Sequence, residues 1–135
     1  MISITDKTLQ DLQFSTVLGT ISSICNTDIG KQKALEIVPF KTKESLMTAL
    51  LQTSEYLSSF QNNNAIPNHG FDAITYEIKL LGIEDSFLEV GSFKKIATIS
   101  ETSNLLIQFF KKFEEYYPYL NAKTSQIEYT KEIIK

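Results

Sequence analysis

The sequence predicts an all-α fold, a compact bundle of about five or six helices, and two observations point to it. Apolar residues recur three or four positions apart along almost the whole chain, which is the spacing of a helix face. Proline, glycine or asparagine interrupts each run, as expected where helices end and turns form. The chain has 135 residues, 42% of them hydrophobic, which suits one domain with a modest core. We therefore expect a single helical domain over residues 1–135.

Residues 5–39 predict three short helices. Their expected amino-terminal caps are, in chain order, Thr5 or Asp6, then Ser15, then Asn26 or Thr27. The apolar face of the second helix consists of Val17, Leu18, Ile21 and Ile24. Pro39 should end the third helix after Val38, because the residue before a proline avoids the α conformation.

The rest of the chain predicts longer helices. One opens after Thr42 and stops at residues 61–64, a shorter one runs from Asp72 to Gly82, and a long one follows Gly91 and lasts to Tyr117. Residues 83–90 predict a turn with one short extended or helical piece. A last helical pattern begins at about residue 120 and reaches Lys135 without a cap, so we expect the chain to be cut from a longer protein in which this helix continues.

Composition limits the function. The net charge is −3, and every basic residue is lysine, whereas arginine is the usual residue for bidentate contact with phosphate or guanine. This argues against a self-sufficient reader of nucleic acid. Cys25 is the only cysteine, which favours a reducing cytosol and an inert buried thiol. The start has no signal-peptide pattern, and no apolar stretch approaches the roughly 18 residues of a membrane span. We expect a cytoplasmic protein with no membrane partner.

We expect no catalytic, cofactor-binding or metal-binding residue in this segment. His69 is the only histidine, and the sequence places no nucleophile or orienting acid at a specific spacing from it. None of the five glycines belongs to a phosphate-binding loop. An aromatic cluster formed by Phe113, Tyr116, Tyr117 and Tyr119 is expected to serve packing or to contact missing chain, with base stacking as the alternative. The candidate nucleic-acid contacts are the lysine pairs of the long helix, Lys94, Lys95, Lys111 and Lys112.

The first forty residues resemble the amino-terminal opening of the MutS-II type, the recombination-suppressing bacterial paralogue of mismatch-repair MutS. The resemblance rests on the order and spacing of Thr8, Leu9, Leu12, Phe14, Val17, Leu18, Ile21, Ile24, Cys25, Thr27, Gly30, Lys31, Ala34, Leu35, Ile37 and Pro39. It continues more loosely through residues 52–55, 66–74 and 82–91. The core-like pattern opens the sequence directly, which favours the MutS-II type, because mismatch-repair MutS places other domains first.

The resemblance implies a whole protein several times longer, with an ATP- and Mg-dependent ATPase domain that forms a homodimer, and in many members a nuclease domain. Such proteins bind branched or mismatched DNA, and some act on ribosomes. This segment would then be a non-catalytic part of the core and lever region that couples the ATPase to the DNA-gripping arms and contacts the rest of its own chain. The alternatives are a free-standing helical adaptor for protein interactions and a small enzyme that uses His69.

Overall fold

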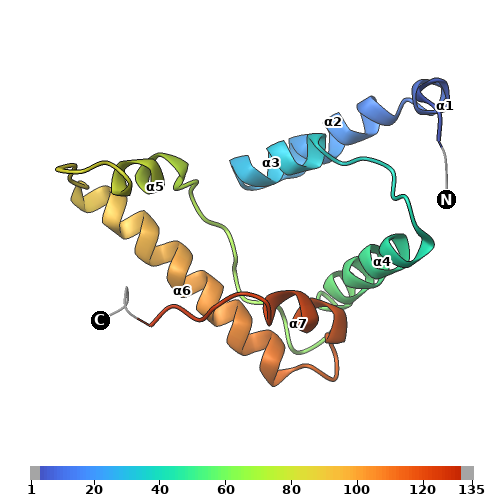
Figure 1. Cartoon of the computed structure of the whole chain (residues 1–135). Helices are drawn as coiled ribbons and strands as arrows, with labels where there is room; N and C mark the ends of the chain where they lie inside the picture. The colour runs from blue at the N-terminus through green and yellow to red at the C-terminus, as the bar shows by residue number, and fades with distance from the viewer. Residues whose placement is uncertain (1–3, 132–135) are drawn as a thin grey trace. The chain divides into compact units, whose positions relative to one another are not determined.

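The computed structural model describes residues 4–131. In this range the chain forms helices joined by turns and loops, and no strands (Figure 1). The seven helices are α1 (Asp6–Asp11), α2 (Phe14–Ile24), α3 (Asp28–Leu35), α4 (Lys43–Ser58), α5 (Thr75–Leu81), α6 (Val90–Lys112) and α7 (Pro118–Thr124). The all-α prediction is confirmed, with seven helices in place of about five or six. Contacts divide the chain between Thr48 and Ala49 into an amino-terminal unit and a carboxy-terminal unit. The single domain over residues 1–135 stays a prediction.

Local hydrogen bonds fix the helices of the amino-terminal unit. The Thr5 hydroxyl oxygen accepts from the backbone N–H of Thr8 at 3.2 Å and caps α1. The Thr27 hydroxyl caps α3 in the same way, accepting from the N–H of Gly30 at 3.0 Å. Both caps agree with the sequence prediction. The expected cap at Ser15 is wrong, because α2 begins at Phe14, two residues earlier than that cap implies, after Gln13 in a left-handed conformation with φ of 50°.

The packing of α2 on α3 gives the amino-terminal unit its small core. Leu18 of α2 and Ala34 of α3 are buried, and the Ser22 hydroxyl donates to the carbonyl of Lys31 at 3.1 Å. α3 ends at Leu35, earlier than predicted. The cause is Pro39, which lacks an N–H for the Leu35 carbonyl and whose ring would clash with that carbonyl if the helix continued.

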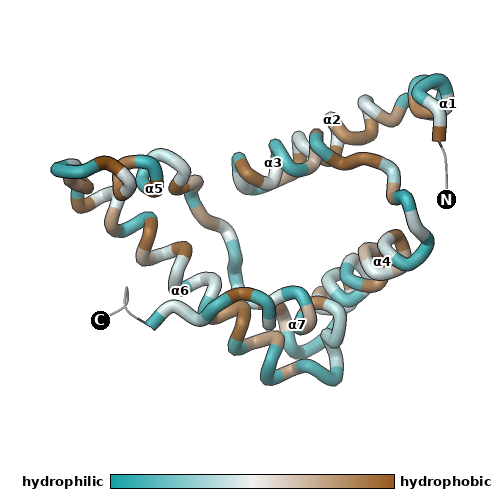
Figure 2. The backbone as a smooth tube through the Cα atoms, in the orientation of Figure 1, coloured by the Kyte–Doolittle hydropathy of each residue, from teal (hydrophilic) through white to brown (hydrophobic). Residues whose placement is uncertain are grey.

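Several side chains expected to face inward do not. Val17, Ile21 and Ile24 of α2 are exposed by 51%, 37% and 75%. Cys25, expected to be buried, is half-buried, and its thiol donates to the carbonyl of Ile21. The segment after α3, residues 37–40, is hydrophobic as well (Figure 2) and also exposed. The apolar pattern therefore identifies faces that this unit alone does not cover.

The carboxy-terminal unit has its core around Tyr117, which is fully buried. Its hydroxyl donates to the carbonyl of Asn64 at 2.9 Å. The rings of Phe109 and Phe110, near the end of α6, lie 5.7 and 5.9 Å from the Tyr117 ring. The carboxylate of Glu55 in α4 accepts from the first free N–H groups of α7, so α4, α6 and α7 meet here.

Several helix boundaries in this unit differ from prediction: α4 ends at Ser58 and not at residues 61–64, and α6 begins at Val90, before Gly91. α5 begins at Thr75 and not at Asp72, although it ends before Gly82 as expected. α6 ends at Lys112, because the next residues form turns that carry Tyr117 into the core. α7 ends at Thr124, and residues 128–131 are not helical. Residues 132–135 lie outside the described part of the chain.

The non-helical segment after α7 is held on α6 by side-chain hydrogen bonds. Buried Asn104 of α6 donates to the carbonyl of Thr130 at 2.6 Å and accepts from its N–H at 2.9 Å. These bonds use both backbone groups that a continuing helix would need. Hydrogen bonds to α6 thus replace helical ones along the last described residues.

Candidate functional site

The four candidate lysines form two separate pairs on α6. Lys94 and Lys95 lie in its first turns, and Lys111 and Lys112 form its last turn. At 1.5 Å per residue, the pairs are roughly 26 Å apart along the helix. The structure therefore does not bring the four lysines together, and their contact with nucleic acid stays a prediction.

Lys95 is committed to an ion pair inside the carboxy-terminal unit. Its Nζ lies 3.3 Å from Oε1 of Glu77, whose side chain is 4% exposed, and the Ser92 hydroxyl donates to the same oxygen. A hydrogen bond from the Glu77 backbone, followed by those of Lys95 and Ser92, lowers the pKa of the Glu77 carboxyl, while burial acts in the opposite direction. The ionised carboxylate offsets the charge that Lys95 could offer to a phosphate.

The other lysines also have neighbours that qualify a phosphate-binding role. Lys94 and Lys95 line a hollow of about 310 Å³ together with Asp72, whose carboxylate adds negative charge beside them. Lys112 Nζ lies 5.2 Å from the centre of the Phe113 ring, at cation–π distance. At the start of α6, Lys94 and Lys95 therefore share their hollow with a carboxylate.

His69 has partners that the sequence did not reveal. Nδ1 lies 2.9 Å from the carbonyl of Pro67, and Nε2 lies 3.2 Å from the hydroxyl of Tyr56. Because a carbonyl can only accept, Nδ1 carries a proton, and the hydroxyl of Tyr56 is the partner of Nε2. Both ring nitrogens are engaged, which gives His69 a structural role in holding the loop on α4. Tyr56 and His69 are thirteen residues apart in sequence, and no local pattern links them.

The aromatic cluster expected near residue 117 separates into buried and exposed rings. Tyr117 is in the core, whereas Tyr116 is 61% and Tyr119 is 40% exposed. Packing, the favoured interpretation, is therefore correct for Tyr117. Tyr116 and Tyr119 have exposed side chains, and base stacking by them stays a prediction.

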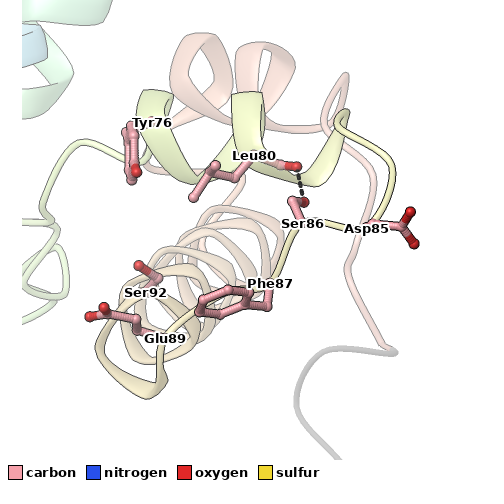
Figure 3. A pocket seen from close by; sticks show the side chains of 7 residues that line it. All are labelled: Tyr76, Leu80, Asp85, Ser86, Phe87, Glu89 and Ser92. Carbon is pink, nitrogen blue, oxygen red and sulfur yellow. Dashed lines mark hydrogen bonds between the residues drawn. The ribbon is translucent and has the colours of Figure 1, made fainter.

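A cavity of about 410 Å³ lies between α5 and the start of α6, and sequence reasoning missed it (Figure 3). The side chains that line it are Tyr76, Leu80, Asp85, Ser86, Phe87, Glu89 and Ser92. Four of them come from residues 83–90, the stretch whose structure the sequence left open. The loop is held by the Ser86 hydroxyl, which donates to the carbonyl of Leu80 at 2.5 Å. The only sequence signal was a mixture of acidic and apolar residues without helical spacing.

Over residues 4–131, no three histidine, cysteine, aspartate or glutamate side chains are grouped so that they could hold a metal ion. No helix in that range has the length and apolar character needed to cross a membrane. No family model, curated protein or solved structure matches the chain. The residues and contacts above are therefore the basis for any functional assignment.

Proposed function

We propose that the chain is a non-catalytic coupling segment of a MutS-II-type protein, a DNA-binding ATPase. The ordered pattern from Thr8 to Pro39 supports this assignment, and the all-α architecture agrees with it. In this proposal the whole protein is cytoplasmic, binds ATP with Mg, forms a homodimer and acts on branched or mismatched DNA. Action on ribosomes and a nuclease domain belong to the same family pattern and extend the proposal.

The observation that carries the proposal is the apolar surface left uncovered. Exposed apolar side chains occur in both units, among them Ile24, Val38, Phe60 and Val90, each more than two-thirds exposed. Surface of this extent is typical of a segment that packs against other protein.

α6 is suited to a mechanical role. It has 23 residues and a length of roughly 34 Å. The Glu77–Lys95 ion pair attaches it to α5 near its start, and Phe109 and Phe110 pack on Tyr117 near its end. A stiff helix fixed at both ends can carry a displacement from one site to another, which is what coupling between an ATPase and DNA-binding arms requires.

The size of the native protein tests this proposal. An antibody raised against the chain should detect a band several times larger than 15.3 kDa in a lysate of the source cells. Purified protein of that size should hydrolyse ATP and bind branched DNA. The isolated chain should bind duplex DNA only in the non-specific range at physiological salt. Tight, salt-resistant binding by the isolated chain would contradict a coupling role.

A free-standing helical adaptor is the second candidate, and the same exposed apolar surface favours it. The adaptor predicts a native band at 15.3 kDa and stoichiometric recovery of one protein partner by affinity purification. A band at that size would contradict the MutS-II assignment.

A further inference from the structure

The cavity between α5 and α6 is lined by α5, by the loop that joins the two helices and by the start of α6. Tyr76 and Leu80 of α5 lie on one side of it, and Phe87 of the preceding loop and Ser92 of α6 lie on the other (Figure 3). We call it the α5–α6 cavity. Phe87 is 82% exposed and Tyr76 is 67% exposed, so neither residue belongs to the core of the carboxy-terminal unit. The cavity thus presents two aromatic side chains and a leucine to a ligand.

The charge around the α5–α6 cavity is negative. Glu89 and Asp85 line it, and no lysine does. Glu89 lies beside Ser92, whereas the Asp85 carboxylate points away from the other lining residues (Figure 3). Among residues 4–131, no lysine forms an ion pair with Glu89. Its carboxylate is therefore available at the edge of a cavity whose apolar lining consists of Tyr76, Leu80 and Phe87.

We propose that the α5–α6 cavity binds a basic side chain, lysine or arginine, of a partner protein. The alkyl stem packs between Leu80 and Phe87, and the cationic end lies near the Glu89 carboxylate and the Tyr76 ring. Aromatic faces and a carboxylate both attract an organic cation, and a long basic side chain supplies the apolar stem that matches the walls. An anionic ligand is disfavoured by both carboxylates. This inference does not depend on the identity of the whole protein.

Binding can be measured by NMR titration of the full 135-residue chain with short capped peptides. A glycine-flanked lysine peptide and its arginine analogue should shift the backbone amides of residues 85–92, with millimolar dissociation constants for a single side chain. The matched control replaces lysine by norleucine, which has a similar stem and no charge. Equal binding of the norleucine peptide, or no shift with the lysine and arginine peptides, would overturn the proposal.

Substitutions locate the interaction. Glu89→Gln should weaken the lysine peptide about fivefold or more, because a charged hydrogen bond is replaced by a neutral one. Tyr76→Leu should weaken it about two- to fivefold through loss of the ring face near the cationic end. Asp85→Asn is the control and should change binding less than twofold; asparagine also tolerates the positive φ of 59° found there. Equal weakening by Asp85→Asn and Glu89→Gln would contradict the assigned geometry.

Two further measurements keep the test decisive. Glu89 precedes α6 without a side-chain capping bond, so circular dichroism of Glu89→Gln should match that of the unmodified chain. If it does not, the norleucine comparison on the unmodified chain decides alone. Butylammonium ion distinguishes a protein partner from a free amine: weaker binding than the lysine peptide supports a partner protein, and equal or tighter binding overturns that part of the proposal.

Discussion

Within the amino-terminal unit the side-chain hydrogen bonds join residues close in sequence, whereas within the carboxy-terminal unit they also join distant residues. In the amino-terminal unit, the longest-range side-chain hydrogen bond among described residues joins Ser22 to the carbonyl of Lys31, nine residues away. In the carboxy-terminal unit, Tyr117 bonds to Asn64 across 53 residues, and Glu55 bonds to Leu120 across 65 residues. The first unit is a set of locally capped helices, and the second is closed by contacts between distant segments.

This difference shows where the stability of the isolated chain should reside. Leu18 and Ala34 are the only buried apolar residues of the described amino-terminal unit, whereas the other unit buries Ile96, Phe110 and Tyr117. Local hydrogen bonds and a minimal core give low protection against local opening. We expect the carboxy-terminal unit to be the more stable one, and the amino-terminal unit to gain most from a covering partner.

Tyr117→Ala should have the largest effect. It removes the one fully buried large side chain and leaves the Asn64 carbonyl without its donor, so we expect a loss of about 3–5 kcal/mol from the free energy of unfolding. Urea unfolding followed by circular dichroism measures the change. The neighbouring Tyr116→Ala, at a residue that is 61% exposed, is the matched control and should cost less than about 1 kcal/mol. Similar losses in the two variants would mean that the core is not centred on Tyr117.

Glu55→Gln should have the next largest effect. Both carboxylate oxygens of Glu55 accept backbone N–H groups at the start of α7, from Tyr119 at 2.9 Å and Leu120 at 2.8 Å. A neutral amide keeps only one accepting oxygen, so we expect a loss of about 1–2 kcal/mol, similar to removal of a helix cap. Glu101→Gln, at an exposed position of α6, serves as the control and should change stability by less than about 0.5 kcal/mol. An unchanged unfolding midpoint for Glu55→Gln would contradict this long-range closure.

Thr27→Ala tests the amino-terminal unit. It removes the hydroxyl that caps α3 through the N–H of Gly30, and we expect a local loss of about 1 kcal/mol. Amide hydrogen exchange should become faster in α2 and α3 while α6 is unaffected. Thr27→Ser keeps the hydroxyl and should retain most of the protection. Faster exchange in α6 as well would show that the units unfold together.

The smallest expected effect is a difference in salt dependence between two carboxyls with lowered pKa values, the exposed Glu36 and the buried Glu77. Side-chain hydrogen bonds from Lys33 and Gln32, together with the Lys33 charge, lower the pKa of Glu36. For both groups the stabilisation is present above the ordinary glutamate pKa of about 4.3 and is lost as pH falls through the lowered pKa. NMR titration should show that added salt raises the pKa of Glu36 more than that of Glu77, because exposed pairs are screened more strongly. An equal response would mean that the Glu77 site is open to solvent.

The features that the sequence predicted correctly depend on neighbours in the chain. The caps at Thr5 and Thr27 need only a hydroxyl and an N–H three residues later, and α5 ends before Gly82 as predicted. Spacing also predicted that Val17, Ile21 and Ile24 share a face. It could not show that the face is exposed, because periodicity does not reveal what covers a surface.

The features that the sequence did not predict depend on distant residues. The segment around Thr130 is not helical because Asn104 binds both of its backbone groups, and His69 is held by Tyr56 on α4. The lysine pairs were correctly placed on one long helix, but the buried carboxylate of Glu77 beside Lys95 had no local signature. The α5–α6 cavity forms only when the loop folds back on α5, and no local sequence pattern predicts the hydrogen bond between Ser86 and Leu80 that holds it there.

Native-state amide hydrogen exchange of the full chain tests the central claim most directly, that long-range contacts stabilise one unit and only local contacts the other. The account predicts at least tenfold greater protection for amides of α6 near Ile96 and Phe110 than for those of α2 and α3, with separate responses to low concentrations of denaturant. Equal protection in α2, α3 and α6, lost together as denaturant increases, would contradict it.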